Sequence, residues 1–430
     1  MKLFGTSGIR AIVDKDLIYV AFKVGLAVGR DNDSVVVGND TRTSSDVMKC
    51  ALISGLLAAG ARSIDIGIVP TPTLAFIAGE FDAGVMITAS HNPPEYNGIK
   101  LWNPDGSAFD STQQKKIEEA ILSNALDIAP WSEMKPGKSR SGAVEQHVER
   151  ILRDFPAKLN CKVVVDAGGG AAAEVTPYLI TMMGGEVIPL NCSHNGMFPR
   201  KSEPTAANLA ELMAAVKHTG AVVGIAHDGD ADRMMAVDDR GRFIPGDALL
   251  VILGRAIGAS SVVTTVDASM VMEEAGFVTR RTRVGDAAVS EELRKGGDFG
   301  GEASGSWIFP GISLCPDGIY AAAQIAAIAS QQRISGLVDR LPSYPLRRGS
   351  IINDGLDMTG LQDKLVALKP QSIETIDGIK LIFKDGWLLV RASGTEPKVR
   401  LTAEAKSETR ARQLYQSGVS IMENSIGRTD

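Results

Sequence analysis

A serine on a proline-rich turn is the first candidate for chemistry in this chain. The segment Thr88-Ala-Ser90-His91-Asn-Pro-Pro-Glu-Tyr-Asn-Gly-Ile-Lys100 follows an apolar run over 83–88 that is typical of a buried strand. Because Asn-Pro-Pro neither continues a strand nor begins a helix well, we expect Ser90 on an exposed, stiff turn. A hydroxyl placed there beside His91, with Lys100 nearby, indicates covalent chemistry, although a capping serine would share the pattern. A serine hydrolase is a rival hypothesis, but Gly-x-Ser-x-Gly is absent and no acid–histidine pair is evident.

Three aspartates alternate with small residues in the segment Asp228-Gly-Asp230-Ala-Asp232-Arg233. Such carboxylates can converge on one Mg²⁺ ion, which prefers oxygen ligands. A helix–loop–helix calcium loop competes, but it needs Gly and Glu where this chain has Arg233 and Asp239. A polar turn with capping side chains is the other alternative. Three carboxylates this close repel one another unless a cation offsets them, so the pattern favours a metal site.

Two further loops carry groups suited to a phosphorylated polyol. The segment Arg391-Ala-Ser393-Gly394-Thr395-Glu-Pro-Lys398-Val-Arg400 combines two guanidinium groups, two hydroxyls and a glycine turn. These groups suit a phosphate dianion, and a hairpin with solvated charges is the alternative. Gly301-Glu302-Ala303-Ser304-Gly305-Ser306 offers a carboxylate and hydroxyls for a polyol, a weak signal by itself. The glycine-rich segment 166–170 lacks nucleotide-loop spacing, which indicates a tight strand-to-helix turn.

The loops follow three copies of one pattern, a strand, a helix, a glycine and a second strand. The copies cover 34–66, 161–190 and 261–279, with helices expected at 46–59, 171–183 and 269–275. Alternating strands and helices predict mostly parallel sheets covered by helices, although any α/β protein shows such runs. Ligands gather beyond the carboxyl ends of the strands in such sheets, so three such loops indicate a shared cleft.

The C-terminal part differs from the three copies. Residues 385–405 are typical of strand, tight loop and strand, and a helix is expected over 407–424. Pro342 and Pro345 mark the start of this smaller unit. We therefore expect four domains, over 1–148, 149–243, 244–343 and 344–430, where the length of 430 residues alone suggests about three.

Composition limits the function classes. The net charge is −6 and no long basic run occurs, which argues against nucleic acid or an anionic membrane as the main partner. Four scattered cysteines indicate a reduced cytosol, with neither a disulfide framework nor a zinc site. We expect no signal peptide and no membrane span, and hence a cytoplasmic protein.

Five of these segments, in this order, resemble the motifs of the α-D-phosphohexomutase superfamily over nearly the whole chain. They are Gly5-Thr-Ser-Gly-Ile-Arg10, Thr88-Ala-Ser-His-Asn-Pro93 with Asn97-Gly-Ile-Lys100, Asp228-Gly-Asp-Ala-Asp-Arg233, Gly301-Glu-Ala-Ser-Gly305 and Arg391-Ala-Ser-Gly-Thr395. The resemblance implies an α/β fold, with three related α/β mixed-sheet domains and a smaller α+β C-terminal domain around a central cleft. Within the superfamily, the compact length and the first motif are most similar to the phosphoglucosamine mutases of archaeal type.

The resemblance also implies a role for each candidate residue. Ser90 would be the phosphoserine, and its phosphate would bind Mg²⁺ together with Asp228, Asp230 and Asp232. The reacting end would be lined by Arg10, His91 and Lys100, with Lys100 a candidate general acid/base. The sugar hydroxyls would contact Glu302 and Ser304, and the distal phosphate would contact Arg391, Ser393, Gly394, Thr395 and Arg400.

The implied reaction interconverts hexose 6-phosphate and hexose 1-phosphate through a 1,6-bisphosphate intermediate, with hexose 1,6-bisphosphate as activator. The expected substrate is glucosamine 6-phosphate, and the expected assembly is a monomer or homodimer. A phosphomannomutase, a phosphoglucomutase or a non-catalytic sugar-phosphate-binding protein are the alternatives. Two positions depart from the family pattern, because Ser306 stands where many relatives have His and Ala11 where most have Gly.

Overall fold

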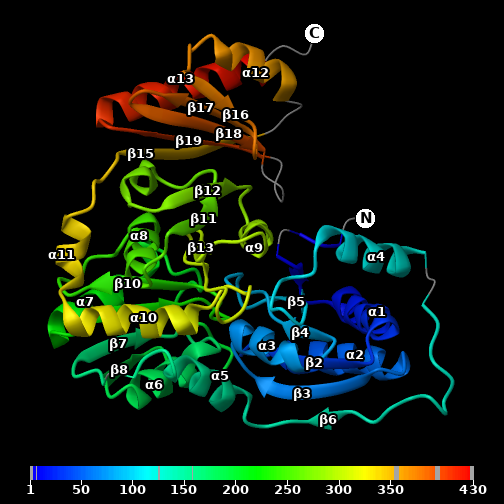
Figure 1. Ribbon diagram of the computed structural model, residues 1–430. Helices are drawn as coiled ribbons and strands as arrows, with labels where there is room; N and C mark the ends of the chain where they lie inside the picture. The colour runs from blue at the N-terminus through cyan, green and yellow to red at the C-terminus, as the bar shows by residue number, and fades with distance from the viewer. Residues whose placement is uncertain are drawn as a thin grey trace.

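The computed structural model describes residues 3–5, 7–123, 126–156, 158–352, 358–392 and 398–426. These residues form four sheets, each with its own helices (Figure 1). No helix in these ranges is long and apolar enough to cross a bilayer.

The first unit is a six-stranded sheet in the order β1-β5-β4-β2-β3-β6. Its elements are β1 (Ile9–Ile12), α1 (Lys15–Asp31), β2 (Ser34–Asn39), α2 (Ser45–Ala58), β3 (Arg62–Ile68), α3 (Thr71–Ile77), η1 (Ala78–Glu80), β4 (Ala83–Ile87), β5 (Tyr96–Trp102), α4 (Ser111–Leu122) and β6 (Lys138–Ser139). The strand β2 lies between the parallel strands β3 and β4, and β5 returns antiparallel to β4.

The second and third units repeat this arrangement on four strands each. The second contains α5 (Ala143–Leu152), β7 (Lys162–Asp166), α6 (Ala172–Met182), β8 (Glu186–Leu190), η2 (Ala206–Asn208), α7 (Ala210–Thr219), β9 (Val223–His227) and β10 (Met234–Asp238). The third contains α8 (Gly246–Ala256), β11 (Ser261–Thr265), η3 (Met270–Glu274), β12 (Val278–Thr282), α9 (Asp286–Arg294), β13 (Phe299–Gly301), β14 (Trp307–Ile308), α10 (Gly318–Gln331) and α11 (Ile334–Asp339).

The same strand order recurs in all three units and confirms the three related mixed-sheet units. The orders β5-β4-β2-β3, β10-β9-β7-β8 and β14-β13-β11-β12 each place two parallel partners beside the first strand and an antiparallel strand at one edge. One expected helix differs, because the segment expected to be helical at 269–275 forms only the short 3₁₀ turn η3. The helix α8 packs against that turn and covers this part of the unit.

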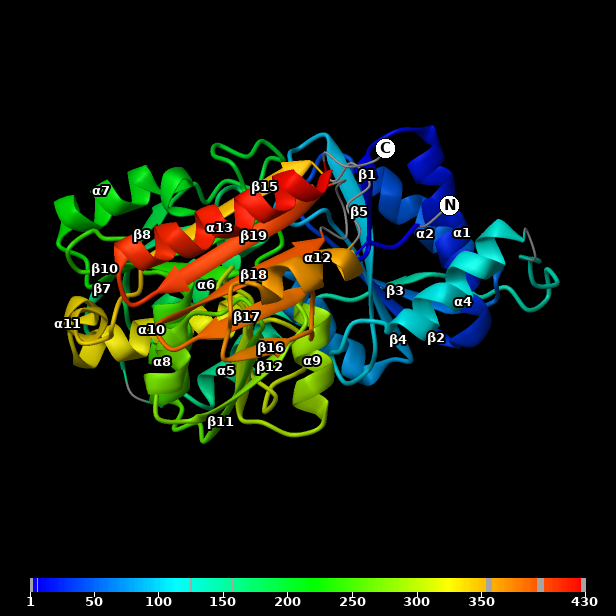
Figure 2. The ribbon, with the colours of Figure 1, turned by 90° about the horizontal axis from the view of Figure 1, so that it is seen from above.

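The C-terminal unit is a five-stranded antiparallel sheet backed by helices. Its elements are β15 (Leu346–Ile352), α12 (Met358–Val366), β16 (Ser372–Glu374), β17 (Ile379–Phe383), β18 (Gly386–Ala392), β19 (Lys398–Ala405) and α13 (Glu408–Ile426). From above, this sheet overlies the third unit (Figure 2), to which Lys380 Nζ is joined by a 2.6 Å hydrogen bond to the carbonyl of Val266.

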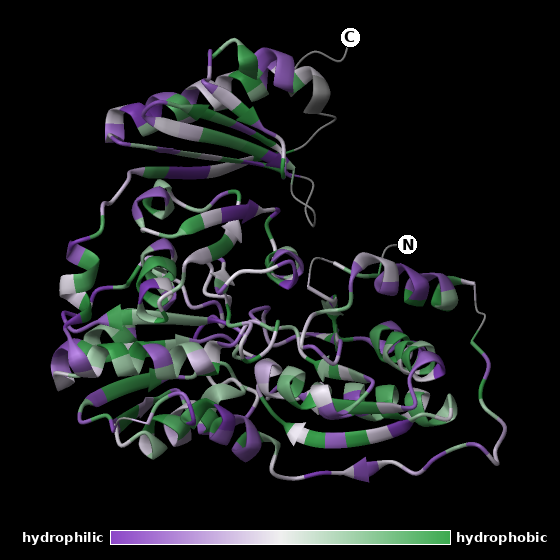
Figure 3. Cartoon of the chain, in the orientation of Figure 1, coloured by the Kyte–Doolittle hydropathy of each residue, from purple (hydrophilic) through white to green (hydrophobic). Residues whose placement is uncertain are grey.

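Hydrophobic packing explains why the second and third units hold a fixed relation. One continuous core runs from Val148 to Ile334, and α10 supplies much of it because that helix is buried on nearly every face. The first and fourth units have separate cores. Hydrophobic residues concentrate in the inner strands and packed helices, whereas the loops where the units meet are mostly polar (Figure 3). The polar loops are therefore free to form a site.

Candidate active site

Three loops occupy equivalent positions in the three repeated units. Residues 88–95 join β4 to β5, residues 228–233 join β9 to β10, and residues 302–306 join β13 to β14. Each follows the carboxyl end of a parallel strand, where side chains of neighbouring strands gather. The repeat therefore brings the Ser90 loop, the aspartate loop and the Glu302 loop to one place.

A cleft of about 670 Å³ lies where the loops meet, and all four units line it. Candidate residues on its wall are Arg10, Ser90, His91, Asp232, Glu302, Ser304, Arg391 and Arg400. Three further candidates, Lys100, Asp228 and Asp230, are buried and contact this set. The candidates Ser393, Gly394 and Thr395 lie outside the described residues.

Ser90 lies on a constrained turn, but its side chain is buried, so our expectation that it is exposed was wrong. The residue is 1% exposed and has a φ of 51°, a left-handed conformation that is costly for a non-glycine residue. Its Oγ donates a 2.7 Å hydrogen bond to Asp228 Oδ2 and lies 3.3 Å from His91 Nδ1. The aspartate loop covers Ser90 so closely that a Cβ on Gly229 would lie 2.5 Å from the Ser90 carbonyl oxygen. Contact with another unit, which local sequence does not show, explains the burial.

Asp228, Asp230 and Asp232 form a buried carboxylate cluster that could hold a metal ion. One carboxylate oxygen from each lies within 4.8 Å of the other two. Oδ1 of Asp230 and Oδ1 of Asp232 are buried and have no hydrogen-bond partner among the described residues. Buried polar atoms are almost always paired, so these two oxygens fit a bound cation. An all-oxygen donor set suits Mg²⁺.

Lys100 supplies one positive charge to the cluster. Its Nζ donates 2.6 Å hydrogen bonds to Oδ2 of Asp230 and Oδ2 of Asp232, and the Lys100 side chain is only 5% exposed. Burial lowers the pKa of Lys100, but the two carboxylates outweigh it and raise the pKa above the ordinary value. Lys100 is therefore a charged ammonium in this structure.

The three carboxylates differ in their affinity for protons. Burial raises the pKa of Asp228, and its two neighbouring aspartates raise it further. Burial also raises the pKa of Asp232, and Asp230 adds to the rise. Burial opposes ionisation of Asp230 too, but Lys100 and a 2.6 Å hydrogen bond from Thr71 Oγ1 lower its pKa overall. Asp230 is thus the most strongly ionised of the three.

His91 and Arg10 lie at the Ser90 end of the cleft. Burial and the nearby Arg233 and Arg10 lower the pKa of His91 to about 3. The imidazole is therefore neutral at pH 7 and can form a hydrogen bond with the Ser90 hydroxyl without adding positive charge to the site. Arg10 Nη1 donates a 3.3 Å hydrogen bond to Asn92, and its Nε is buried without a partner among the described residues.

The Glu302 loop forms a tight turn whose carboxylate faces the cleft. Glu302 Oε1 accepts a 2.9 Å hydrogen bond from the backbone N–H of Gly285. Burial raises the pKa of Glu302 to about 7, with Asp286 adding to the rise and Arg233 opposing it. Ser306, the departure from the family pattern, is buried in the wall of the same cleft.

Arginines from the C-terminal sheet line a second pocket at the other end of the cleft. Arg391 on β18 lies directly opposite Arg400 on β19, which concentrates positive charge at this place. Both line a pocket of about 390 Å³ with Arg348 and Asp267. Asp377 lies 3.4 Å from Arg391 and offsets part of its charge.

Sequence analysis missed two groups of residues at the site. Arg348 was not among the candidate residues, yet it lines both the cleft and the pocket that contains Arg391 and Arg400. Asp40 and Arg42 hold the Ser90 loop from behind, and both follow the carboxyl end of β2. Their position beside the end of β4, the next strand in the sheet, was the signal that could have found them.

Comparisons with known proteins agree with this geometry. Four models of phosphoglucomutase/phosphomannomutase match in chain order: α/β/α domain I at residues 1–127, domain II at 144–241, domain III at 245–344 and the C-terminal domain at 351–417. A protein named "Probable phosphoglucosamine mutase" from Methanocella arvoryzae is 48% identical over 99% of both chains.

Two solved structures share the fold over nearly the whole length. A phosphoglucomutase/phosphomannomutase family protein from Burkholderia thailandensis is 28% identical, with a TM-score of 0.87 over 100% of this chain and 98% of that one. The Aspergillus fumigatus N-acetylphosphoglucosamine mutase, solved in complex with GlcNAc-6P and magnesium, is 16% identical with a TM-score of 0.62, over 99% and 96% of the two chains, and shows the fold alone. The chain therefore belongs to the phosphoglucomutase/phosphomannomutase family of the α-D-phosphohexomutase superfamily.

Proposed function

We propose that this protein is a phosphoglucosamine mutase that interconverts glucosamine 6-phosphate and glucosamine 1-phosphate through phosphoserine at Ser90. The observation that carries the proposal is the pairing of a buried Ser90 hydroxyl with Asp228, at 2.7 Å, inside a carboxylate cluster with unsatisfied oxygens. The name of the Methanocella arvoryzae relative supports the choice of glucosamine. Binding alone would need neither the serine nor the strained turn, which argues against a non-catalytic sugar-phosphate-binding protein.

The residues around Ser90 suit reversible phosphoryl transfer. In the forward step the bond between phosphorus and Ser90 Oγ breaks and a bond from phosphorus to a sugar hydroxyl oxygen forms. The sugar hydroxyl loses one proton and Ser90 Oγ gains one, so that serine leaves the step as a free hydroxyl. Asp228, Asp230 and Asp232, together with the Ser90 phosphate, would hold Mg²⁺. The ion would offset the negative charge of the transferring group. Lys100, held as an ammonium, and Arg10 add positive charge at the same end of the cleft as Ser90. Lys100 remains our candidate general acid/base.

The opposite end of the cleft would hold the phosphate that is not reacting. Arg391 and Arg400 carry this part of the proposal, together with Ser393, Gly394 and Thr395 from the loop between β18 and β19. Glu302 and Ser304 would bind sugar hydroxyls between the two ends. The 1,6-bisphosphate formed in the first step would turn around and return its other phosphate to Ser90. A distant clamp is required because each end must be held while the other reacts.

The proposal also includes the domain boundaries, the cellular location, the oligomeric state and the activator. Each sheet lies within one of the ranges 1–148, 149–243, 244–343 and 344–430, which supports four domains, while the first boundary falls inside α5 (Ala143–Leu152). We also propose a cytoplasmic monomer or homodimer that hexose 1,6-bisphosphate activates by phosphorylating Ser90.

The test compares wild type with Ser90→Ala. We expect wild type incubated with glucose 1,6-bisphosphate to gain the mass of one phosphoryl group, mapped to Ser90 by peptide sequencing. Ser90→Ala should fold normally, gain no mass and show no turnover. Wild type that never takes phosphate from the bisphosphate would refute the mechanism. Because the family also includes phosphoglucomutases and phosphomannomutases, kcat/KM should be compared for glucosamine, glucose and mannose 1-phosphates, and a tenfold preference for either neutral sugar would overturn the substrate assignment.

A further inference from the structure

A buried ion pair lies directly behind the Ser90 loop and takes no part in the chemistry proposed so far. Asp40 and Arg42 follow the end of β2, and neither side chain is exposed. Arg42 Nε donates a 3.0 Å hydrogen bond to Asp40 Oδ2. Fully buried charges are costly unless they are paired and hydrogen-bonded, so the remaining donors of Arg42 must also have partners.

Every remaining donor of Arg42 contacts the backbone of the Ser90 loop. Nη1 donates to the carbonyl oxygens of Pro93 at 2.6 Å and Tyr96 at 2.8 Å, and Nη2 donates to those of Ser90 and Asn92, both at 2.8 Å. An arginine has five N–H donors in a planar fork, and all five are used here. The ring of Phe198, from the second unit, lies 5.0 Å from the guanidinium. The guanidinium therefore fixes the course of the loop from Ser90 to Tyr96.

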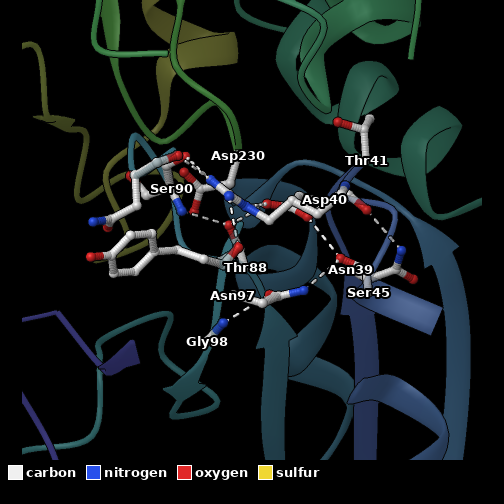
Figure 4. A network of polar contacts seen from close by, with 12 residues as sticks. Asn39, Asp40, Thr41, Ser45, Thr88, Ser90, Asn97, Gly98 and Asp230 are labelled. Atoms are coloured by element: carbon white, nitrogen blue, oxygen red, sulfur yellow. Dashed lines mark hydrogen bonds and ion pairs between the residues drawn. The ribbon is translucent and has the colours of Figure 1, made fainter. Parts of the chain in front are cut away.

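The carboxylate of Asp40 is connected to the backbone N–H of Ser90 through the hydroxyl of Thr88. Thr88 Oγ1 donates a 2.7 Å hydrogen bond to Asp40 Oδ2 and accepts a 2.8 Å bond from the backbone N–H of Ser90 (Figure 4). One ion pair thus holds both the N–H and the carbonyl of Ser90. This explains how Ser90 keeps a φ of 51° without being glycine.

We propose that Asp40, Arg42 and Thr88 are positioning residues that keep Ser90 Oγ aimed at Asp228 both before and after phosphate transfer. The proposal rests on the proposed mutase function. Ser90 alternately carries about two negative charges and none, and a freely hinged loop would move with each change. Anchors on the backbone do not change when the side chain gains or loses phosphate, so the reacting oxygen returns to the same position.

The second unit contains a similar arrangement. Asp166, at the end of β7, accepts a 2.9 Å hydrogen bond from Arg200 Nε, and Arg200 Nη2 donates a 2.7 Å bond to the carbonyl of His227 at the end of β9. The two arginines come from different places in the sequence, two and 34 residues after their aspartates. The first and second units thus use the same kind of ion pair to hold the backbone where the Ser90 loop and the aspartate loop begin.

Thr88→Val tests the proposal because valine keeps the shape of threonine but cannot bond to Asp40 or to the Ser90 N–H. The matched control is Thr41→Val, at the residue between Asp40 and Arg42. Thr41 is also buried, but its hydroxyl donates to the carbonyl of Gly169 at 2.8 Å and lies apart from Ser90 in Figure 4. Both variants are checked by circular dichroism and thermal unfolding, loaded with glucose 1,6-bisphosphate, and assayed for kcat and KM. If Thr88→Val does not fold, Arg42→Lys, which keeps the charge but loses donors, replaces it.

We expect Thr88→Val to lower kcat at least tenfold with KM within twofold, because the distal phosphate and sugar sites do not touch Thr88. The ³¹P resonance of phosphoserine should also shift or broaden relative to wild type. Thr41→Val should stay within twofold of wild type in both constants. A folded Thr88→Val with the kinetics and ³¹P resonance of Thr41→Val would overturn the positioning proposal alone. Wild type without turnover or phosphoserine would overturn the mutase function and the positioning proposal with it.

Discussion

Replacing Lys100 by methionine should destabilise the protein strongly, and Mg²⁺ should restore much of the loss. Methionine keeps the length of the side chain but removes the ammonium that bonds to Asp230 and Asp232 at 2.6 Å each. The variant would leave three buried carboxylates close together with their repulsion less offset.

The size of the effect follows from burial. The side chains of Lys100, Asp230 and Asp232 are 5%, 0% and 7% exposed, and removing one partner of a buried pair costs about 3–5 kcal/mol. The exposed pair of Lys116 with Asp31, at 2.8 Å, is a control expected to contribute about 0–1 kcal/mol. Mg²⁺ at 100 times its Kd stabilises a protein by about 2.7 kcal/mol, and each tenfold gain in affinity adds about 1.4 kcal/mol.

The assay is urea unfolding of wild type, Lys100→Met and Lys116→Met, each with EDTA and over a series of Mg²⁺ concentrations. Without Mg²⁺ only Lys100→Met should lose several kcal/mol of stability. Added Mg²⁺ should stabilise Lys100→Met more than wild type, because the ion no longer competes with an ammonium. Equal stabilisation of all three proteins, or a loss in Lys100→Met no larger than in Lys116→Met, would show that Lys100 does not offset the charge of a metal site.

Two further predictions concern Arg391 and Glu302, which line other parts of the cleft. Arg391→Ala should weaken binding of glucosamine 6-phosphate by about ten- to a hundredfold in calorimetric titration, since a hydrogen bond to a charged group contributes about 1.5–3 kcal/mol. Arg412→Ala is an exposed control that should leave the Kd unchanged. An equal Kd for both variants would show that the phosphate binds elsewhere. The pKa of Glu302 is raised to about 7 by burial and by Asp286, so the folded protein holds this proton more tightly than the unfolded chain does. The stability that the protonated Glu302 contributes is full below about pH 4.5 and is lost as the pH rises to about 7. Glu302→Gln should therefore gain stability relative to wild type as pH rises from 5 to 8 in thermal unfolding, and a pH-independent difference would contradict the raised pKa of Glu302.

Much of the fold could be predicted from sequence because each unit repeats a local pattern. Short β-branched runs indicated the strands, and a glycine after each helix indicated where that helix ends. The strand order confirms the repeat. The loops that gather around the cleft could be predicted because each comes after the strand that follows the repeated pattern, namely β4, β9 or β13. The 3₁₀ turn at Met270–Glu274 was not predicted, since composition alone does not show that α8 already covers that part of the unit.

The parts of the site that escaped prediction depend on contacts between distant segments. Ser90 looked exposed because its burial comes from Asp228 and Gly229, in another unit. No sequence motif singled out Arg42, and only the fold shows its five donors in use. The partners of Lys100 are 130 and 132 residues away along the chain. Local patterns carry no information about such pairs.

The burial of Ser90 would limit which agents can change the phosphorylation state that we propose for it. A kinase or phosphatase protein acts on a chain segment that it can draw into its own active site, and a turn tied down by four carbonyl bonds and covered by a second unit cannot be drawn out. Small molecules still reach the serine, because it forms part of the wall of the cleft. In the proposed mechanism, the fraction of enzyme molecules that carry phosphate would then be set by the ratio of sugar bisphosphate to sugar monophosphate in the surrounding solution.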